Sequence, residues 1–147
     1  MKRFSLLFIG MLLIFSSCVK PKRVVEEFYT PEQPKLVAYY TTEDGVKVKV
    51  EEEKYYENGK LEYKGGYDKD KRRNGRWEYY FNNGKLWSIG EYEYGKMEGK
   101  KEVYWPDGQI RYKGQFSNNK KSGHWVFYNA DGSVLKEMDV EPNRDLK

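Results

Sequence analysis

Residues 75–95 read GRWEYYFNNGKLWSIGEYEYG, and the plan of this stretch recurs along the chain. Its Asn-Gly pair lies between two runs rich in Tyr, Trp and Phe, which is the strongest local sign of a β-hairpin. Equivalent pairs follow one another at intervals of 25, 24 and 24 residues: Asn58-Gly59, Asn83-Gly84, Asp107-Gly108 and Asp131-Gly132. This spacing predicts a row of short hairpins.

Two further glycine series keep the same spacing. The first is Gly65, Gly90 and Gly114, each followed two residues later by Tyr or Phe. The second is Gly75, Gly99 and Gly123. Three markers in register indicate an internal repeat of about two dozen residues, which is typical of architectures that grow one unit at a time.

A two-residue type I′ turn at each Asn-Gly or Asp-Gly pair fixes the register of the strands. That register pairs opposite charges in three hairpins, namely Glu53 with Lys64, Arg76 with Glu91, and Glu102 with Lys113. Opposite charges facing one another across strands stabilise a sheet by a few tenths of a kcal/mol each. The charge pattern therefore supports the two-residue turn.

The same register sorts the remaining side chains onto two faces. We expect one face to be buried; it carries Trp77 opposite Gly90, Trp125 opposite Met138, and the pairs Tyr56 with Leu61, Phe81 with Leu86 and Trp105 with Ile110. The other face carries the charge pairs and a column of tyrosines, for which packing of hairpin on hairpin is favoured over ligand stacking: Tyr55, Tyr80, Tyr104 and Tyr128.

These residues resemble the variant MORN repeat. Gly75-Arg76-Trp77, Tyr80, Asn83-Gly84-Lys85-Leu86 and Gly90-Glu91-Tyr92 follow its shape, and the resemblance extends over residues 54–136. Lys101 departs from it at the Trp position, which weakens the core of that unit. The resemblance implies an all-β fold, an antiparallel meander of stacked β-hairpins. It also implies a repeat protein of the kind found in bacterial surface lipoproteins and antitoxin-like proteins.

The start of the chain has the features of a lipoprotein signal peptide. Lys2 and Arg3 precede an apolar run over residues 4–15, which is too short to span a bilayer. Ser16-Ser17-Cys18 then resembles the lipobox, in which the Cys18 thiol takes a diacylglycerol. We expect a protein anchored through Cys18 to the cell membrane or outer membrane, facing the periplasm or the cell surface.

The chain is thus divided into four parts. We expect a signal peptide over 1–17, the lipidated Cys18 and a proline-containing flexible tether over 18–34, the repeat domain over 35–140, and a frayed tail over 141–147. Within the domain, residues 39–50 around Asp44-Gly45 predict one degenerate hairpin that caps the array, with Glu52 as the counterpart of Trp77.

Catalytic groups are scarce. The only cysteine is Cys18, and the only histidine is His124, which the register places opposite Asp139 as a surface pair. Neither a Cys-His nucleophile nor a His-rich metal site can be built from these residues. The net charge of +4 falls to +2 without residues 1–17, and it requires no nucleic-acid partner. We therefore expect no enzyme, cofactor, metal, nucleic acid or small-molecule ligand.

An interaction surface is the remaining possibility. The densest positive cluster is Lys69, Lys71, Arg72 and Arg73, for which a solvated loop is the favoured interpretation and contact with an acidic partner or anionic lipid the alternative. Further candidates are Trp87, Tyr94, Lys96 and Tyr104. We expect a protein-binding module at the cell envelope; the alternatives are an antitoxin-like inhibitor of a toxin and a glycan-binding surface protein.

Overall fold

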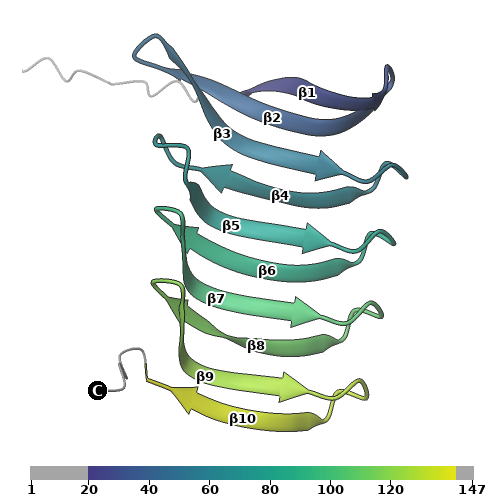
Figure 1. Ribbon diagram of the computed structural model, residues 1–147, viewed down its shortest axis with the longest axis vertical. Coiled ribbons are helices and arrows are strands. Elements are labelled where there is room, and N and C mark those ends of the chain that lie inside the picture. Colours follow the sequence, from purple (N-terminus) through teal and green to yellow (C-terminus); the bar gives the residue numbers. More distant parts are fainter. Residues whose placement is uncertain (1–19, 142–147) are drawn as a thin grey trace, which may run out of the picture.

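Ten strands follow one another across a single antiparallel sheet in the order of the sequence (Figure 1). The computed structural model describes residues 20–141. Within these residues each strand pairs only with its neighbours along the chain, which confirms the expected all-β meander. The same residues contain no helix long and apolar enough to cross a bilayer. The strands are β1 (Lys22–Thr30), β2 (Gln33–Glu43), β3 (Val46–Tyr55), β4 (Leu61–Tyr67), β5 (Arg73–Tyr80), β6 (Leu86–Glu93), β7 (Lys96–Tyr104), β8 (Ile110–Ser117), β9 (Lys120–Tyr128) and β10 (Val134–Val140).

The sheet is one layer thick, and no second layer covers either face within the described residues (Figure 1). The side chains are therefore buried mainly against one another within a face. Few apolar side chains are buried: Val37, Ala38, Trp77, Ile89, Val103, Trp125 and Val126. The expected burial of Tyr56, Leu61, Phe81, Leu86, Trp105 and Ile110 is wrong, since all six are half-buried.

The register in the middle of each hairpin agrees with the sequence. Glu53 pairs with Lys64, Arg76 with Glu91, and Glu102 with Lys113, as the charge pattern predicts. The predicted positions of Trp77 opposite Gly90, Trp125 opposite Met138 and His124 opposite Asp139 are also confirmed.

The turns at the Asn-Gly and Asp-Gly pairs differ from the prediction. The Gly59 N–H donates to the Tyr56 carbonyl (2.9 Å) and the Tyr56 N–H to the Lys60 carbonyl (2.8 Å), so the loop has three residues. Only its last residue, Gly59, has a positive φ, of 77°. The Asn58 side chain accepts a hydrogen bond from the Lys60 N–H (3.0 Å) and so holds the loop closed. The loops around Gly84, Gly108 and Gly132 repeat this bonding.

A β-bulge in each hairpin compensates for the longer loop. Tyr55 pairs with Leu61 and Lys54 with Tyr63, which leaves Glu62 as an extra residue and restores the predicted register. The predicted pairs Tyr56 with Leu61, Phe81 with Leu86 and Trp105 with Ile110 are therefore wrong by one residue. The extra residues of the four bulges are Glu62, Trp87, Arg111 and Leu135.

Type I′ geometry is found at the opposite ends of the strands. Both central residues have positive φ in Asp44-Gly45 (49° and 78°), Tyr94-Gly95 (49° and 83°) and Asn118-Asn119 (52° and 67°). These turns join β2 to β3, β6 to β7 and β8 to β9, and together with the loop 68–72 between β4 and β5 they form the connector edge of the sheet (Figure 1). The expected hairpin at Asp44-Gly45 is confirmed.

The sheet begins earlier than the sequence predicts. Residues 22–34 were expected to be part of a tether, but β1 forms and pairs with β2. The prolines around it are tolerated because Pro21 precedes β1, Pro31 lies in the turn, and Pro34 lies in β2 beyond the last pair that β2 makes with β3. The domain therefore starts at Lys22 and not at residue 35. The signal peptide, Cys18 and residues 142–147 of the tail lie outside the described residues.

Candidate functional site

One row of paired residues crosses the sheet and alternates large and small side chains. Glu52, Trp77 and Lys101 occupy equivalent positions on β3, β5 and β7, and Trp125 continues the series on β9. Glycines stand beside them on the intervening strands: Glu52 pairs with Gly65, Gly65 also with Trp77, and Lys101 with both Gly90 and Gly114. The face that carries these large side chains is called the aromatic face.

The two tryptophans of this row are packed onto glycine backbone. A Cβ on Gly65 would lie 2.1 Å from the Trp77 ring, and a Cβ on Gly114 would lie 2.2 Å from the Trp125 ring. The sequence placed Trp77 across from Gly90, but the glycine under its ring is Gly65 of the preceding strand. Each tryptophan also gathers neighbouring rings: Tyr63, Tyr67, Tyr79 and Tyr92 around Trp77, and Tyr112, Phe116 and Phe127 around Trp125.

Lys101 leaves a gap between these two aromatic clusters. An added Cβ on Gly90 would meet Tyr92 at 3.5 Å and Lys101 at 3.6 Å, which is ordinary van der Waals contact. The lysine stem therefore fills much less of the space over glycine than an indole does. A pocket of about 300 Å³ opens here, called the Lys101 pocket; its lining residues are Tyr79, Trp87, Ser88, Tyr92, Lys101, Val103, Arg111 and Tyr112.

The polar groups of the Lys101 pocket are cations and hydroxyls. The Lys101 ammonium donates to the Ser88 hydroxyl at 3.1 Å, and burial lowers the pKa of Lys101. The Arg111 guanidinium lies over the Trp105 ring, 4.4 Å from its centroid. No carboxylate is among the lining residues. The pocket thus combines positive charge with aromatic walls.

Glu52, the other charged member of the row, is surrounded differently. Its carboxylate pairs with the Lys49 ammonium at 2.9 Å and accepts a hydrogen bond from the Tyr63 hydroxyl at 2.8 Å. Burial would lower the pKa of Lys49, but its hydrogen bonds to Glu26 and Glu52 raise it overall. The negative charge of Glu52 is thus compensated inside the sheet.

On the opposite face, called the charged face, glutamate carboxylates accept hydrogen bonds from side chains of the same face. Three tyrosine hydroxyls donate to the glutamate two residues earlier: Tyr55 to Glu53 (2.6 Å), Tyr80 to Glu78 (2.5 Å) and Tyr104 to Glu102 (2.6 Å). Burial and the hydrogen bond to the neighbouring glutamate raise the pKa of Tyr80 and Tyr104 to about 12. Three members of the predicted tyrosine column are therefore held by hydrogen bonds within their own repeat, and the fourth, Tyr128, has the Lys113 ammonium 5.9 Å from its ring centroid.

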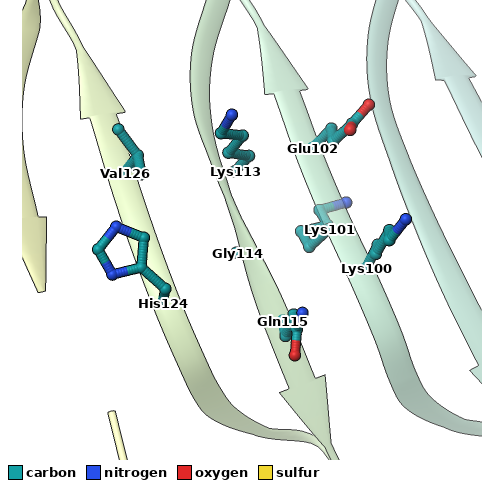
Figure 2. A pocket seen from close by; sticks show the side chains of 8 residues that line it. All are labelled: Lys100, Lys101, Glu102, Lys113, Gly114, Gln115, His124 and Val126. Atoms are coloured by element: carbon teal, nitrogen blue, oxygen red, sulfur yellow. The ribbon is translucent and has the colours of Figure 1, made fainter. Parts of the chain in front are cut away.

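A shallow hollow on the charged face lies around Gly114, with Lys113 and His124 on neighbouring strands (Figure 2). His124 bonds Asp139 through Nδ1 (2.8 Å) and lies 3.4 Å from Glu137 through Nε2. The hydrogen bond to Asp139 raises the pKa of the imidazole. The predicted surface pair is thus formed, and both nitrogens of the ring face carboxylates.

The predicted basic cluster does not act as one patch. Arg72 pairs with Asp68 (2.8 Å) and Asp70 (2.7 Å) within the loop 68–72. Arg73 lies on β5 with its guanidinium 4.2 Å from the Trp77 ring centroid. Lys69 and Lys71 remain exposed in the loop. The charge of Arg72 is therefore neutralised by two aspartates, and the charge of Arg73 lies over the Trp77 ring instead of in the loop.

The four further candidates lie in three places. Tyr94 and Lys96 are exposed on the connector edge, where the Arg72 guanidinium lies 5.1 Å from the Tyr94 ring centroid. Trp87 is 45% exposed on the aromatic face, beside Tyr79. Tyr104 lies on the charged face with Glu102. Trp87 and Tyr104 therefore cannot contact one ligand face together.

The sequence did not identify Ser88, Lys101 and Arg111 as site residues. Its one signal was the departure of Lys101 from the Trp position, which was interpreted only as a weaker core. Arg111 gave no signal, because its position depends on the bulge of the β7–β8 hairpin. Among residues 20–141 no three His, Cys, Asp or Glu side chains are grouped so that they could hold a metal ion.

Comparison with known proteins agrees with the repeat. The family model of the MORN repeat variant matches residues 50–69, 73–94 and 97–118. No curated protein matches the chain. A solved structure described as "Crystal Structure of TarM" aligns with 82% of this chain at 12% identity and a TM-score of 0.31, and the aligned part spans only 21% of that protein. MORN repeats suggest a module that interacts with proteins or membranes. Three consecutive segments of the chain between residues 50 and 118 therefore match the MORN repeat variant.

Proposed function

We propose that this protein is a lipid-anchored, non-enzymatic module of the cell envelope that binds a partner protein through its aromatic face. The observation that carries the proposal is the aromatic face of a sheet one layer thick, where Trp87 is 45% exposed and the cationic Lys101 pocket opens. Exposed aromatic surface with a few convergent polar groups is typical of recognition sites. Nucleic acid, cofactors and small molecules have no part in the proposal.

The charged face is the less suitable surface. Its glutamates already accept hydrogen bonds from tyrosines, and Glu78 also pairs with Lys64 (3.1 Å) and Arg76 (2.6 Å). A partner would have to displace these internal contacts before it could form its own. The aromatic face offers rings and an uncompensated ammonium without that cost.

Photo-crosslinking in the native cells tests the proposal. A photoreactive phenylalanine analogue at Trp87 reports on the aromatic face, and the same analogue at Lys113 is the control on the charged face. We expect one discrete protein adduct from position 87 and none from position 113. Equal labelling from both positions, or labelling of lipid or glycan alone, would contradict the proposal.

The anchor needs its own experiment, because Cys18 lies outside the described residues. The sequence supports acylation of its thiol, and two or three acyl chains contribute enough buried methylene groups for stable attachment to a membrane. We expect wild-type protein to incorporate labelled palmitate and to sediment with membranes. Cys18→Ser is expected to lose both properties. The control variant Lys20→Gln, which changes a charged residue close to Cys18 but keeps the thiol, is expected to retain them.

Glycan binding is the second candidate, and the exposed Trp87 ring is the observation that favours it. The antitoxin-like alternative rests on the family resemblance alone and stays a prediction. A toxin among the photo-crosslinked adducts would support it.

A further inference from the structure

The third repeat keeps the glycine of the repeat but has lost the ring that covers it. Trp77 and Trp125 press on Gly65 and Gly114, whereas the equivalent glycine, Gly90, has no indole above it and meets only ordinary contacts with the Tyr92 and Lys101 side chains. The Lys101 pocket is the resulting gap, with one aromatic cluster on each side. Lys101 in place of tryptophan therefore reduces the packing over Gly90 and leaves a recess at the centre of the aromatic face.

The positive charge in this recess lacks a compensating acid. Lys101 bonds only the neutral hydroxyl of Ser88 among the contacts found in residues 20–141, and Arg111, the second cation, lies over the Trp105 ring. Glu52 is the contrasting case, because the equivalent position on β3 carries a charge that Lys49 neutralises. A half-buried ammonium without a counter-ion favours a ligand that supplies the missing negative charge.

We propose that the Lys101 pocket binds the carboxylate of an acidic side chain that the partner protein projects onto the aromatic face. The inference rests on the function proposed above and names the chemistry of the partner. Lys101 and Arg111 provide the charge, and the Ser88 hydroxyl holds the ammonium in place. The rings of Trp87, Tyr79 and Tyr112 contact the aliphatic part of the acidic side chain and its neighbours.

The lining distinguishes this ligand from two others. A neutral sugar presents hydroxyl groups that both donate and accept, and such a ligand is usually met by carboxylate or amide side chains, which this lining does not contain. Free phosphate would match the cations but leave the aromatic walls without a partner. A carboxylate on a short aliphatic stem matches both parts of the pocket, and its volume of about 300 Å³ is adequate for one such side chain.

Peptide binding to the purified full-length protein tests the inference. The probes are acetyl-Phe-Glu-Phe-amide and its Gln counterpart, with dissociation constants measured by calorimetry. We expect the Glu peptide to bind about tenfold more tightly, the size expected for a hydrogen bond to a charged group. Lys101→Met should abolish this preference. Lys121→Met should keep it, because Lys121 lies on the same face over the Trp125 ring, outside the pocket.

Lys101→Trp provides a second variant. It restores the residue found at the equivalent positions of β5 and β9, so the protein should fold with an unfolding midpoint at least equal to that of the wild type. Filling the pocket should at the same time remove the preference for the Glu peptide. A Lys101→Trp protein that is folded and still prefers the Glu peptide would overturn the inference.

Further outcomes are equally decisive. Equal affinity for the two peptides, or a preference that survives Lys101→Met, would show that the pocket does not read a carboxylate side chain. Tighter binding of glucuronate or inorganic phosphate than of the Glu peptide would assign the pocket to an acidic sugar or a phosphate and also overturn the inference. If crosslinking from Trp87 to a protein persists in either case, the proposed function stands without the carboxylate.

Discussion

The indole of Trp77 on β5 lies directly on the backbone of Gly65 on β4, where a side chain would come within 2.1 Å of the ring. The equivalent contact joins Trp125 to Gly114 in the last repeat. Since the sheet has no second layer in the described residues, these ring-on-glycine contacts supply much of the burial that stabilises the two repeats that contain them.

Gly65→Ala is expected to destabilise the protein. The added methyl group would overlap the Trp77 ring, and overpacking of this kind typically costs about 1–3 kcal/mol. Gly90→Ala is the matched control, because an added Cβ there finds only ordinary contacts. Urea unfolding should show a lower midpoint for Gly65→Ala and nearly wild-type behaviour for Gly90→Ala; equal effects would disprove the packing argument.

Lys71→Gly is expected to stabilise the protein. Lys71 has a φ of 61° in the loop between β4 and β5, a conformation that costs an ordinary L-residue about 1 kcal/mol. Glycine relieves this strain but gains freedom in the unfolded chain, so a net increase of about 0.5 kcal/mol in unfolding free energy is expected. Lys69→Gly, at a residue without positive φ, should give no increase. Thermal unfolding of both variants distinguishes the two results.

His124 should make stability depend on pH. The hydrogen bond to Asp139 raises its pKa above the ordinary 6.5, so the folded state binds the proton more tightly than the unfolded chain. The resulting stabilisation is complete below about pH 6.5 and is lost as the pH rises through the folded pKa. His124→Gln should remove this loss from the unfolding midpoints. NMR titration of the imidazole to an ordinary pKa would contradict the prediction.

Lys101 should act in the opposite direction at alkaline pH. Burial lowers its pKa below the ordinary 10.5, so in that range the unfolded chain binds the proton more tightly than the folded protein. The contribution of this residue to stability therefore rises with pH from the folded pKa up to 10.5. Lys101→Met should be more stable than wild type at neutral pH, and the difference should shrink in alkali. A constant difference across the pH range would show that charge burial is not its cause.

Much of the fold could be predicted because the strongest signals are local and repeated. The charge pairs Glu53 with Lys64 and Glu102 with Lys113 gave the correct register in mid-strand. The turn type was wrong because a three-residue loop followed by a bulge at Glu62 gives the same mid-strand register as a two-residue turn. β1 was missed because the prolines around it resemble a linker until their positions before the strand, in the turn and near the start of β2 are known.

The site could be predicted only in part. Strand alternation indicated which residues share a face in mid-strand, but the bulges add one residue beside each loop and bring Trp87 onto the aromatic face with Tyr79. The pocket exists because no indole ring lies over Gly90. The absence of such a contact produces no recognisable sequence motif. Only the comparison of Lys101 with Trp77 and Trp125 in space shows that the departure from the repeat opens a recess.

The strictly sequential pairing of the strands has a consequence for damage. A cut near the carboxyl end frees β10, yet β1 to β9 keep every backbone hydrogen bond they make with one another. Proteolysis at this terminus therefore removes one strand after another and leaves the rest of the sheet paired, whereas a closed or knotted fold would lose its structure as a whole. The Lys101 recess, on β6, β7 and β8, is reached only after β10 and β9 have been lost.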